Sequence, residues 1–116
     1  MKTHKQLDVW KDSINLTIAV YQITKRFPSQ EQFGLTNQLR RAAVSVPANI
    51  AEGAGRLSPK EFQHFLRIST GSLSEVETLL IISHELHYLS ANDLQTIHPK
   101  IKLITSQLSG LIKSLN

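Results

Sequence analysis

The sequence predicts an all-α protein, an antiparallel up-down-up-down four-helix bundle with a proline-kinked second helix. Apolar residues recur at steps of three and four along most of the chain, without strand-like alternation or an Asn-Gly hairpin signal. Proline, glycine and capping residues divide the chain into four helical segments. The connections are short, which favours antiparallel neighbours. We expect one domain over residues 1–116.

The first helix is expected over residues 7–26 and carries two apolar stripes. We assign to the core the stripe formed by Leu7, Trp10, Ile14, Ile18 and Tyr21. A second stripe lies nearly opposite and contains Val9, Leu16, Val20, Ile23 and Phe27. Because a helix in a lone small bundle needs only one buried stripe, we assign to an oligomer interface Val9, Leu16, Val20 and Ile23. A deeply inserted helix is the alternative.

The second helix is expected over residues 35–54, with Thr36 as a plausible N-cap. Pro47 falls inside this segment. An interior proline removes a backbone hydrogen bond and clashes with the carbonyl four residues earlier, so the helix should kink there unless it breaks. Gly53 and Gly55 supply the stop.

The start of the third helix is the firmest boundary in the chain. Ser58 is placed as N-cap, Pro59 as the first helical residue and Glu61 as the capping-box partner. Leu57 and Phe62 have the spacing of a hydrophobic staple. From this start the helical pattern runs to about residue 88.

Two further features concern the second half of the chain. Gly71 interrupts the third helix, and we expect another backbone to come close there. Residues 90–93 offer cap candidates for a fourth helix. Pro99 leaves two alternatives open: the helix is continuous, or its first turn is split off.

The composition narrows the class of protein. The absence of cysteine excludes disulfides and cysteine-ligated metal centres. No apolar run has the length of a membrane span, and no signal-peptide pattern follows Met1, so we expect a cytoplasmic protein without a membrane partner. The formal net charge of +4 permits an acidic partner such as nucleic acid.

Positive charge gathers in two parts of the chain. The last acidic residue is Asp93, and the tail after it carries Lys100, Lys102 and Lys113. The other group provides the candidate nucleic-acid contacts, which are Arg40, Arg41, Arg56 and Lys60. Since no helix-turn-helix spacing or RNA-recognition aromatic motif occurs, binding is expected mainly at the phosphate backbone and should be sensitive to salt.

One polar stripe stands out on the second helix, where steps of four, four and three align Arg41, Ser45, Asn49 and Glu52. Three interpretations stay open: an arginine-based phosphate site, a polar subunit contact, or an intrachain network that pairs Arg41 with Glu52 or with Glu75. Asn49 and Glu52 are therefore added to the candidate interface residues.

Catalytic and cofactor signatures are missing from the sequence. There is no nucleophile elbow, phosphate-cradling loop or dinucleotide glycine fingerprint. His84 and His87 form an incomplete metal set and are better explained by the field at a helix C-terminus. We therefore expect a non-enzymatic protein with no catalytic residues, no metal, no cofactor and no small-molecule substrate.

Several segments of the chain resemble the bacterial 23S rRNA-intervening-sequence proteins. The resemblance covers residues 7 to about 89 in order, and its most specific run is residues 47–53. The family signature is matched by Arg40, Arg41, Asn49, Glu52, Gly53 and Arg56.

The resemblance implies a four-helix bundle that assembles into a ring, with a homopentamer favoured. It further implies kinship with the accessory protein of diversity-generating retroelements, which works with a reverse transcriptase and nucleic acid. Together with the basic excess, it predicts a homo-oligomer that associates with structured RNA or a nucleoprotein complex. A protein-interaction scaffold without nucleic-acid binding is the alternative.

Overall fold

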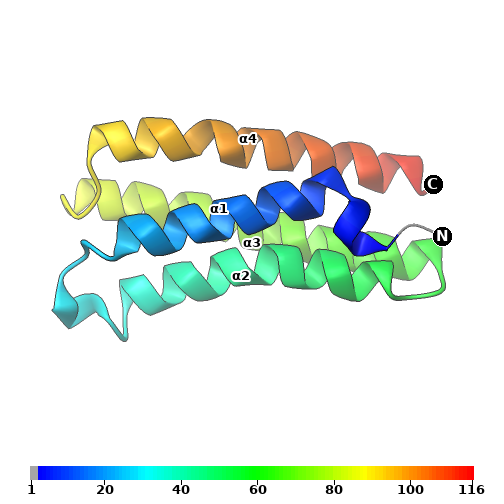
Figure 1. The fold of residues 1–116 in the computed structure, drawn as a ribbon, viewed down its shortest axis with the longest axis horizontal. Helices are drawn as coiled ribbons and strands as arrows, with labels where there is room; N and C mark the ends of the chain where they lie inside the picture. The colour runs from blue at the N-terminus through cyan, green and yellow to red at the C-terminus, as the bar shows by residue number, and fades with distance from the viewer. Residues whose placement is uncertain (1–2) are drawn as a thin grey trace.

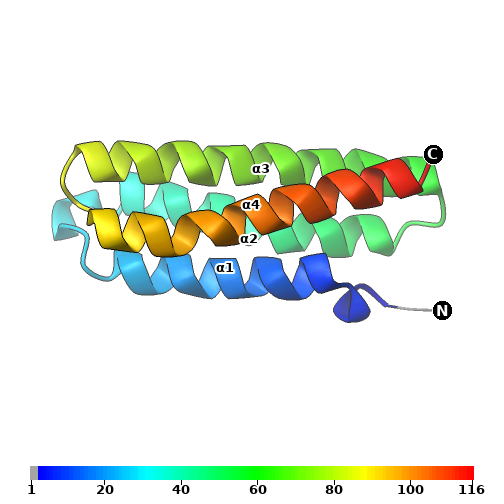
Figure 2. The ribbon, with the colours of Figure 1, turned by 90° about the horizontal axis from the view of Figure 1, so that it is seen from above.

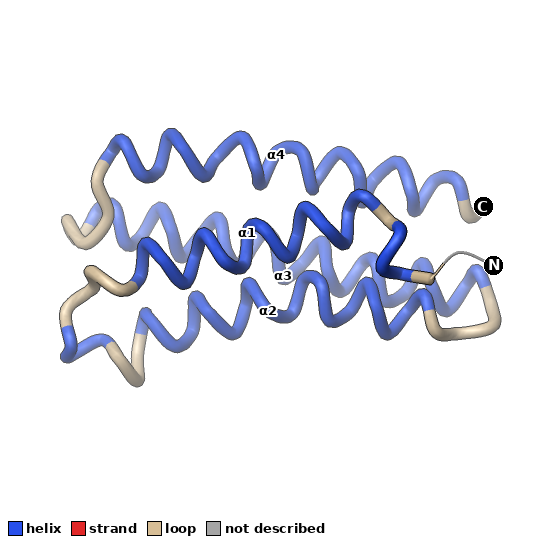
Figure 3. Tube along the Cα trace, in the orientation of Figure 1, coloured by secondary structure: helices blue, strands red, loops and turns tan. Residues whose placement is uncertain are grey.

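A computed structural model describes residues 3–116 and shows four long helices, with no strand among these residues. The all-α prediction is confirmed (Figure 1 and Figure 3). The helices are α1 (Asp8–Thr24), α2 (Leu35–Ala54), α3 (Pro59–Glu85) and α4 (Ala91–Ser114). Short 3-10 turns precede α1 and α2, at η1 (His4–Gln6) and η2 (Ser29–Glu31).

Consecutive helices run in opposite directions and lie side by side, as predicted (Figure 1 and Figure 2). The contacts α1–α2, α2–α3, α3–α4 and α4–α1 close the bundle, so the α1–α2 seam lies opposite the α3–α4 seam. The bundle measures 44 × 25 × 19 Å. None of the helices within residues 3–116 combines the length and the apolar content that a membrane span requires.

Ser58 caps α3 as predicted, and Ser90, one of the cap candidates in residues 90–93, caps α4. The backbone N–H of Glu61 donates to Ser58 Oγ at 3.1 Å, and that of Asp93 donates to Ser90 Oγ at 3.0 Å. The predicted hydrophobic staple between Leu57 and Phe62 is wrong, because Leu57 is 97% exposed. Helix α3 ends three residues earlier than expected, where the chain turns to the positive φ of His87.

The predicted cap at Thr36 is also wrong. Helix α2 begins at Leu35, the expected start, with Gly34 as N-cap, so Thr36 lies inside the helix and is buried. Glu31 supplies the missing acceptor, since its Oε1 receives the backbone N–H of Leu35 at 3.2 Å. Its Oε2 accepts a hydrogen bond from the Tyr88 hydroxyl at 3.1 Å. One carboxylate thus joins the start of α2 to the loop after α3.

Helix α2 continues through the buried Pro47, so the alternative of a break is wrong, while the kink remains a prediction. The proline cannot donate to the carbonyl of Ala43, four residues earlier. Thr17 on α1 supplies a donor in its place, because its hydroxyl shares its proton between the Ala43 carbonyl at 3.1 Å and the Ser13 carbonyl of its own helix at 2.8 Å. A side chain of one helix thereby satisfies a backbone acceptor that the proline of the next leaves free. Helix α4 likewise continues through Pro99.

The close approach of helices lies at Gly53 rather than at Gly71. A Cβ added to Gly53 would lie 2.7 Å from Phe65 Cβ and 3.0 Å from Phe62 Cδ1, whereas a Cβ on Gly71 would meet nothing within 4 Å. Gly53 is buried inside α2 and is not its stop. Small size at this position therefore lets α2 pack directly on α3.

The roles of the two apolar stripes of α1 are largely the reverse of those predicted, although Leu7 and Trp10 of the predicted core stripe do pack, partly buried, against the core. Val9, Leu16 and Val20 belong to the core of the single chain, with at most 5% of each residue exposed, so their assignment to an oligomer interface is wrong. Ile23 packs partly buried against the same core. The buried face includes the small Ser13 and Thr24, and side chains this small let α1 approach its neighbours closely.

The stripe assigned to the core instead faces outward at its centre. Ile18 is 51% exposed and Tyr21 is 41% exposed, while Trp10 and Ile14 are half-buried. The first helix is therefore two-faced, as predicted. Its outward apolar face is formed by Ile14, Ile18 and Tyr21, here called the α1 outer stripe.

Candidate nucleic-acid and subunit interfaces

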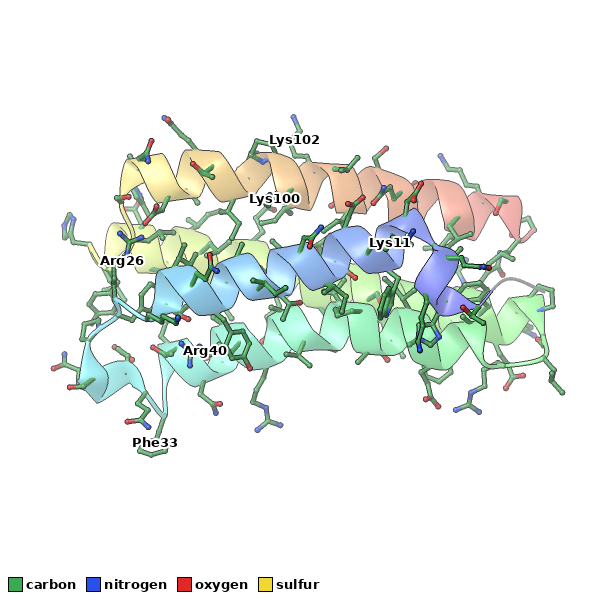
Figure 4. All side chains as sticks on the ribbon, viewed as in Figure 1. Lys11, Arg26, Phe33, Arg40, Lys100 and Lys102 are labelled. Carbon is green, nitrogen blue, oxygen red and sulfur yellow. The ribbon has the colours of Figure 1, made fainter. Side chains whose placement is uncertain are left out.

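Arg40 has a structural role that the sequence did not predict. Its Nε donates to Thr24 Oγ1 at 2.8 Å and its Nη2 donates to the Tyr21 carbonyl at 3.4 Å. The guanidinium carbon lies 4.6 Å from the centroid of the Tyr21 ring, a cation–π distance. Arg40 thus ties α2 to α1, and Figure 4 shows it at this seam. Two of its five N–H donors are already used within the chain.

The other three predicted nucleic-acid contacts differ in how accessible they are. Arg56 forms an ion pair with Glu52 at 2.6 Å, and its guanidinium carbon lies 4.9 Å from the centroid of the Phe65 ring. Arg41 and Lys60 are exposed and take part in no ion pair among residues 3–116. These two side chains are therefore accessible to a phosphate group, as predicted for a nucleic-acid contact.

The four predicted contacts do not form one site. Arg40 and Arg41 lie in the first third of α2, whereas Arg56 and Lys60 flank the connection to α3 at the other end of the bundle. Thirteen residues of helical rise, roughly 20 Å, separate Arg41 from the end of α2 at Ala54, beyond which Arg56 lies. In a single chain, a ligand that touches both ends must span the length of α2.

The polar stripe on α2 forms a network within the chain. Ser45 Oγ lies 2.9 Å from Ser72 Oγ on α3, and Asn49 Nδ2 donates to the Ser45 carbonyl and hydroxyl at 2.8 and 2.9 Å. Glu52 pairs with Arg56 and not with Arg41, so the expected Arg41–Glu52 pair is wrong. Asn49 and Glu52 have intrachain partners, and their contact with a second subunit remains a prediction.

A polar groove between α3 and α4 is the candidate site that the sequence analysis missed. Its volume is about 610 Å³, and its lining residues are Glu77, Ile101, Lys102, Thr105, Ser106, Ser109, Gly110 and Lys113. Two lysines and three hydroxyl residues therefore follow one edge of α4. We call this the α4 groove.

The spacing of the polar residues in the α4 groove places them on one face of α4. Lys102, Ser106, Ser109 and Lys113 recur at steps of four, three and four, which places them on one helical face. The same face carries no acidic side chain of α4, and the one carboxylate in the lining is Glu77 of α3, which lies 3.4 Å from His98 Nε2. The two lysines are about 16 Å apart along the helix, which several consecutive phosphates can span. This periodicity of lysine and serine could have identified the α4 groove residues from the sequence.

The electrostatics around α1 and α4 are mixed. Figure 4 places Lys11 on α1 and Lys100 and Lys102 on α4, along the upper part of the bundle in that view. Lys100 lies with Asp12 and Asn15 around a small depression of about 90 Å³. Arg26 is already paired with Asp93 across the end of the bundle. The α4 groove is therefore a better cationic candidate than the α1–α4 seam.

The histidines do not form a metal site. Among residues 3–116, no group of three or more histidine, aspartate, glutamate or cysteine residues is arranged to hold a metal ion. His87 lies beyond the end of α3 with φ 65°, so it no longer shares a helical face with His84. The pKa of Tyr88, which follows His87, is raised by its hydrogen bond to Glu31, by desolvation and by the Glu31 charge.

Comparison with known proteins agrees with this fold. The family model of the 23S rRNA-intervening sequence proteins matches residues 5–110. A solved structure with the same fold is a protein of unknown function from the S23 ribosomal protein family of Bacteroides thetaiotaomicron. It is 23% identical, with a TM-score of 0.83, and the match covers 90% of this chain and 95% of that chain. No curated protein matches the sequence. Because the family model spans nearly the whole sequence, the chain belongs to the 23S rRNA-intervening sequence protein family.

Proposed function

We propose that this protein is a non-enzymatic, cytoplasmic homo-oligomer, with a pentamer the favoured size, that associates with structured RNA or a nucleoprotein complex. The α4 groove carries the proposal for RNA. It presents Lys102 and Lys113 beside the exposed Ser106 and Ser109. Lysine supplies charge to phosphate, and hydroxyls hydrogen-bond to phosphate or ribose without reading sequence.

The α1 outer stripe supports assembly. Ile18 is 51% exposed and Tyr21, with Arg40 over its ring, is 41% exposed, and the half-buried Ile14 lies on the same face. Exposed apolar side chains that share one face are a feature of protein interfaces. Assembly would also bring several copies of the α4 groove together, which multiplies the modest charge of one subunit.

The test for RNA is a titration of structured RNA at two salt concentrations, with two variants of equal charge. Lys102→Ser combined with Lys113→Ser removes the two groove lysines, whereas Lys5→Ser combined with Lys25→Ser removes two exposed lysines elsewhere. Each lost phosphate contact lowers the slope of log affinity against log salt by about 0.7 to 0.9. The groove variant should therefore lose about 1.4 to 1.8 from the slope per engaged subunit, and the control should lose much less.

The outcome also separates the two functional classes. Equal effects of the two variants would contradict the α4 groove as the site and point to diffuse charge. No binding by the wild type at low salt would remove the RNA role altogether. A scaffold without nucleic-acid binding would then be favoured, consistent with the intrachain use of Arg40 and Arg56.

Assembly is tested with a matched pair of substitutions. Ile18→Glu places a carboxylate in the α1 outer stripe, and Leu57→Glu places one on an aliphatic residue that is 97% exposed at the far end of the bundle. If the stripe is an interface, only Ile18→Glu should lower the molar mass in solution, because a charge buried in an apolar contact is costly. An unchanged mass for Ile18→Glu would contradict this use of the stripe.

A further inference from the structure

The α4 groove contains two hydroxyl groups that the chain itself does not use. Among residues 3–116, the bonded hydroxyls of α4 are those of Thr96, Thr105 and Ser114, each of which donates to a carbonyl of its own helix. Ser106 and Ser109 line the groove, are exposed and make no such bond. Each of these two hydroxyls is therefore free to donate a hydrogen bond to a ligand and to accept one from it.

Lysines flank the two hydroxyls along the helix. The helical rise of about 1.5 Å per residue places Ser106 about 6 Å and Ser109 about 10 Å beyond Lys102. Lys113 follows, and neither lysine takes part in an ion pair among the residues that the structure describes. A Cβ added to Gly110 would meet nothing within 4 Å, so the surface between the lysines is open. The groove thus has hydroxyls in its middle and a positive charge at each end.

The lining of the groove is suited to a nucleic-acid backbone and not to bases. Within the part of the chain that the structure describes, no aromatic, arginine, asparagine or glutamine side chain lines it. Single-stranded RNA is recognised mainly by stacking of its bases on aromatic rings, and base edges in a major groove are read mainly by arginine, asparagine and glutamine. Contacts to phosphate and sugar remain. A duplex, whose bases stay stacked, is therefore the form of nucleic acid that the groove suits.

RNA and DNA duplexes differ in the surface that they offer to α4. The minor groove of A-form RNA is wide and shallow and displays the ribose 2′-hydroxyls. The minor groove of B-DNA is about 6 Å wide, narrower than an α-helix of about 10 Å with its side chains, and its sugars have no 2′-hydroxyl. In the RNA minor groove the 2′-hydroxyls lie between the phosphates of the two strands. Hydroxyls between two lysines match that arrangement.

From these observations we propose that the α4 groove binds the backbone of an RNA duplex and distinguishes it from DNA. Ser106 and Ser109 form hydrogen bonds to ribose 2′-hydroxyls, and Lys102 and Lys113 contact the flanking phosphates. This inference rests on the proposed association with RNA, and it names the form of RNA and the groups that recognise it.

Binding of matched duplexes to the full chain tests the proposal. The probes are an RNA duplex, the DNA duplex of the same sequence, and the RNA duplex with every 2′-hydroxyl methylated, which keeps the A-form but removes the hydroxyl donor. The wild type should bind the RNA duplex at least about fivefold more tightly than either of the others, as expected for two hydrogen bonds. One strand of the RNA alone should bind more weakly than the duplex.

Serine variants separate the hydroxyls from the lysines. Ser106→Ala and Ser109→Ala should each weaken binding of the RNA duplex about two- to tenfold, the range for one hydrogen bond. The affinity for DNA and the salt slope should stay unchanged, because no charge is lost. Alanine is the better helix former, so α4 should be retained. Ser29→Ala is the matched control, since Ser29 is exposed outside α4, and it should bind RNA as the wild type does.

The outcomes distinguish this proposal from the RNA role itself. If the RNA duplex binds but the DNA or the methylated duplex binds equally well, or if both groove serine variants bind as the wild type does, the hydroxyl contact is overturned and the RNA role stands. Equal or tighter binding of the single strand overturns the preference for a duplex. If no RNA binds at low salt, both proposals fail.

Discussion

Replacement of Gly53 by alanine tests how α2 packs on α3. In an isolated helix this change would be favourable by about 1 kcal/mol, because alanine is the better helix former. In the bundle the added methyl group would lie 2.7 Å from Phe65 Cβ and 3.3 Å from the Phe62 carbonyl oxygen. Neither atom can move aside by rotation of a side chain. The helices must therefore separate, and overpacking of this kind costs about 1 to 3 kcal/mol.

The net effect follows from these opposed terms. Because a rotamer change relieves neither contact, the overpacking cost is taken at the upper end of that range, about 3 kcal/mol. Against a propensity gain of about 1 kcal/mol, Gly53→Ala should then lower the free energy of unfolding by about 2 kcal/mol. For 116 residues the entropy of unfolding is roughly 0.24 kcal/mol/K, so the melting temperature should fall by about 8 °C.

Gly71→Ala provides the matched control, because it makes the same substitution inside a helix where a Cβ meets nothing within 4 Å. It should raise the free energy of unfolding by up to about 1 kcal/mol and the melting temperature by up to about 4 °C. Both variants are compared by thermal circular dichroism at one protein concentration, since assembly makes the melting temperature concentration-dependent. A Gly53→Ala variant as stable as the wild type, or shifts of equal sign in the two variants, would refute the packing argument.

Two other predictions concern hydrogen bonds between distant segments. Thr17→Val leaves the Ala43 carbonyl without its side-chain donor and should lower the free energy of unfolding in urea by about 1 to 3 kcal/mol. The control is Thr70→Val, which should cost clearly less because the Thr70 hydroxyl bonds only within α3. Equal losses would contradict the claim that Thr17 compensates for the backbone N–H that Pro47 lacks. The hydrogen bond to Glu31 raises the pKa of Tyr88 above its ordinary value of 10.0. The stability that this hydrogen bond contributes is therefore complete below about pH 10 and is lost as the pH rises through the pKa of Tyr88 in the folded protein. Absorbance titration of tyrosinate in the wild type and in Tyr88→Phe checks the direction, and a value at or below the ordinary one would oppose it.

Helix boundaries with a short-range chemical cause could be predicted from the sequence. Ser58 and Ser90 cap their helices through backbone groups three residues away, so the relevant partners are visible in the local pattern. The Thr36 cap failed because the acceptor that serves α2 belongs to Glu31, which precedes the helix and also bonds to Tyr88. Capping by a residue held in place from another part of the chain leaves no local signature.

The face of α1 that is buried could not be predicted from periodicity. Its two apolar stripes have the same spacing, and only the position of the neighbouring helices decides between them. The roles of Gly53 and Thr17 depend equally on partners in another helix. By contrast, the α4 groove was visible in principle, because lysine and serine share one face of a helix that has no acid after Asp93.

The central claim is that the apolar surface left exposed on the single chain serves self-assembly. Light scattering coupled to size exclusion, at micromolar protein concentration, measures the molar mass without reference to shape. The account predicts a mass that is a multiple of the 13.0 kDa chain, with five subunits favoured. A mass of one chain at every concentration would contradict it.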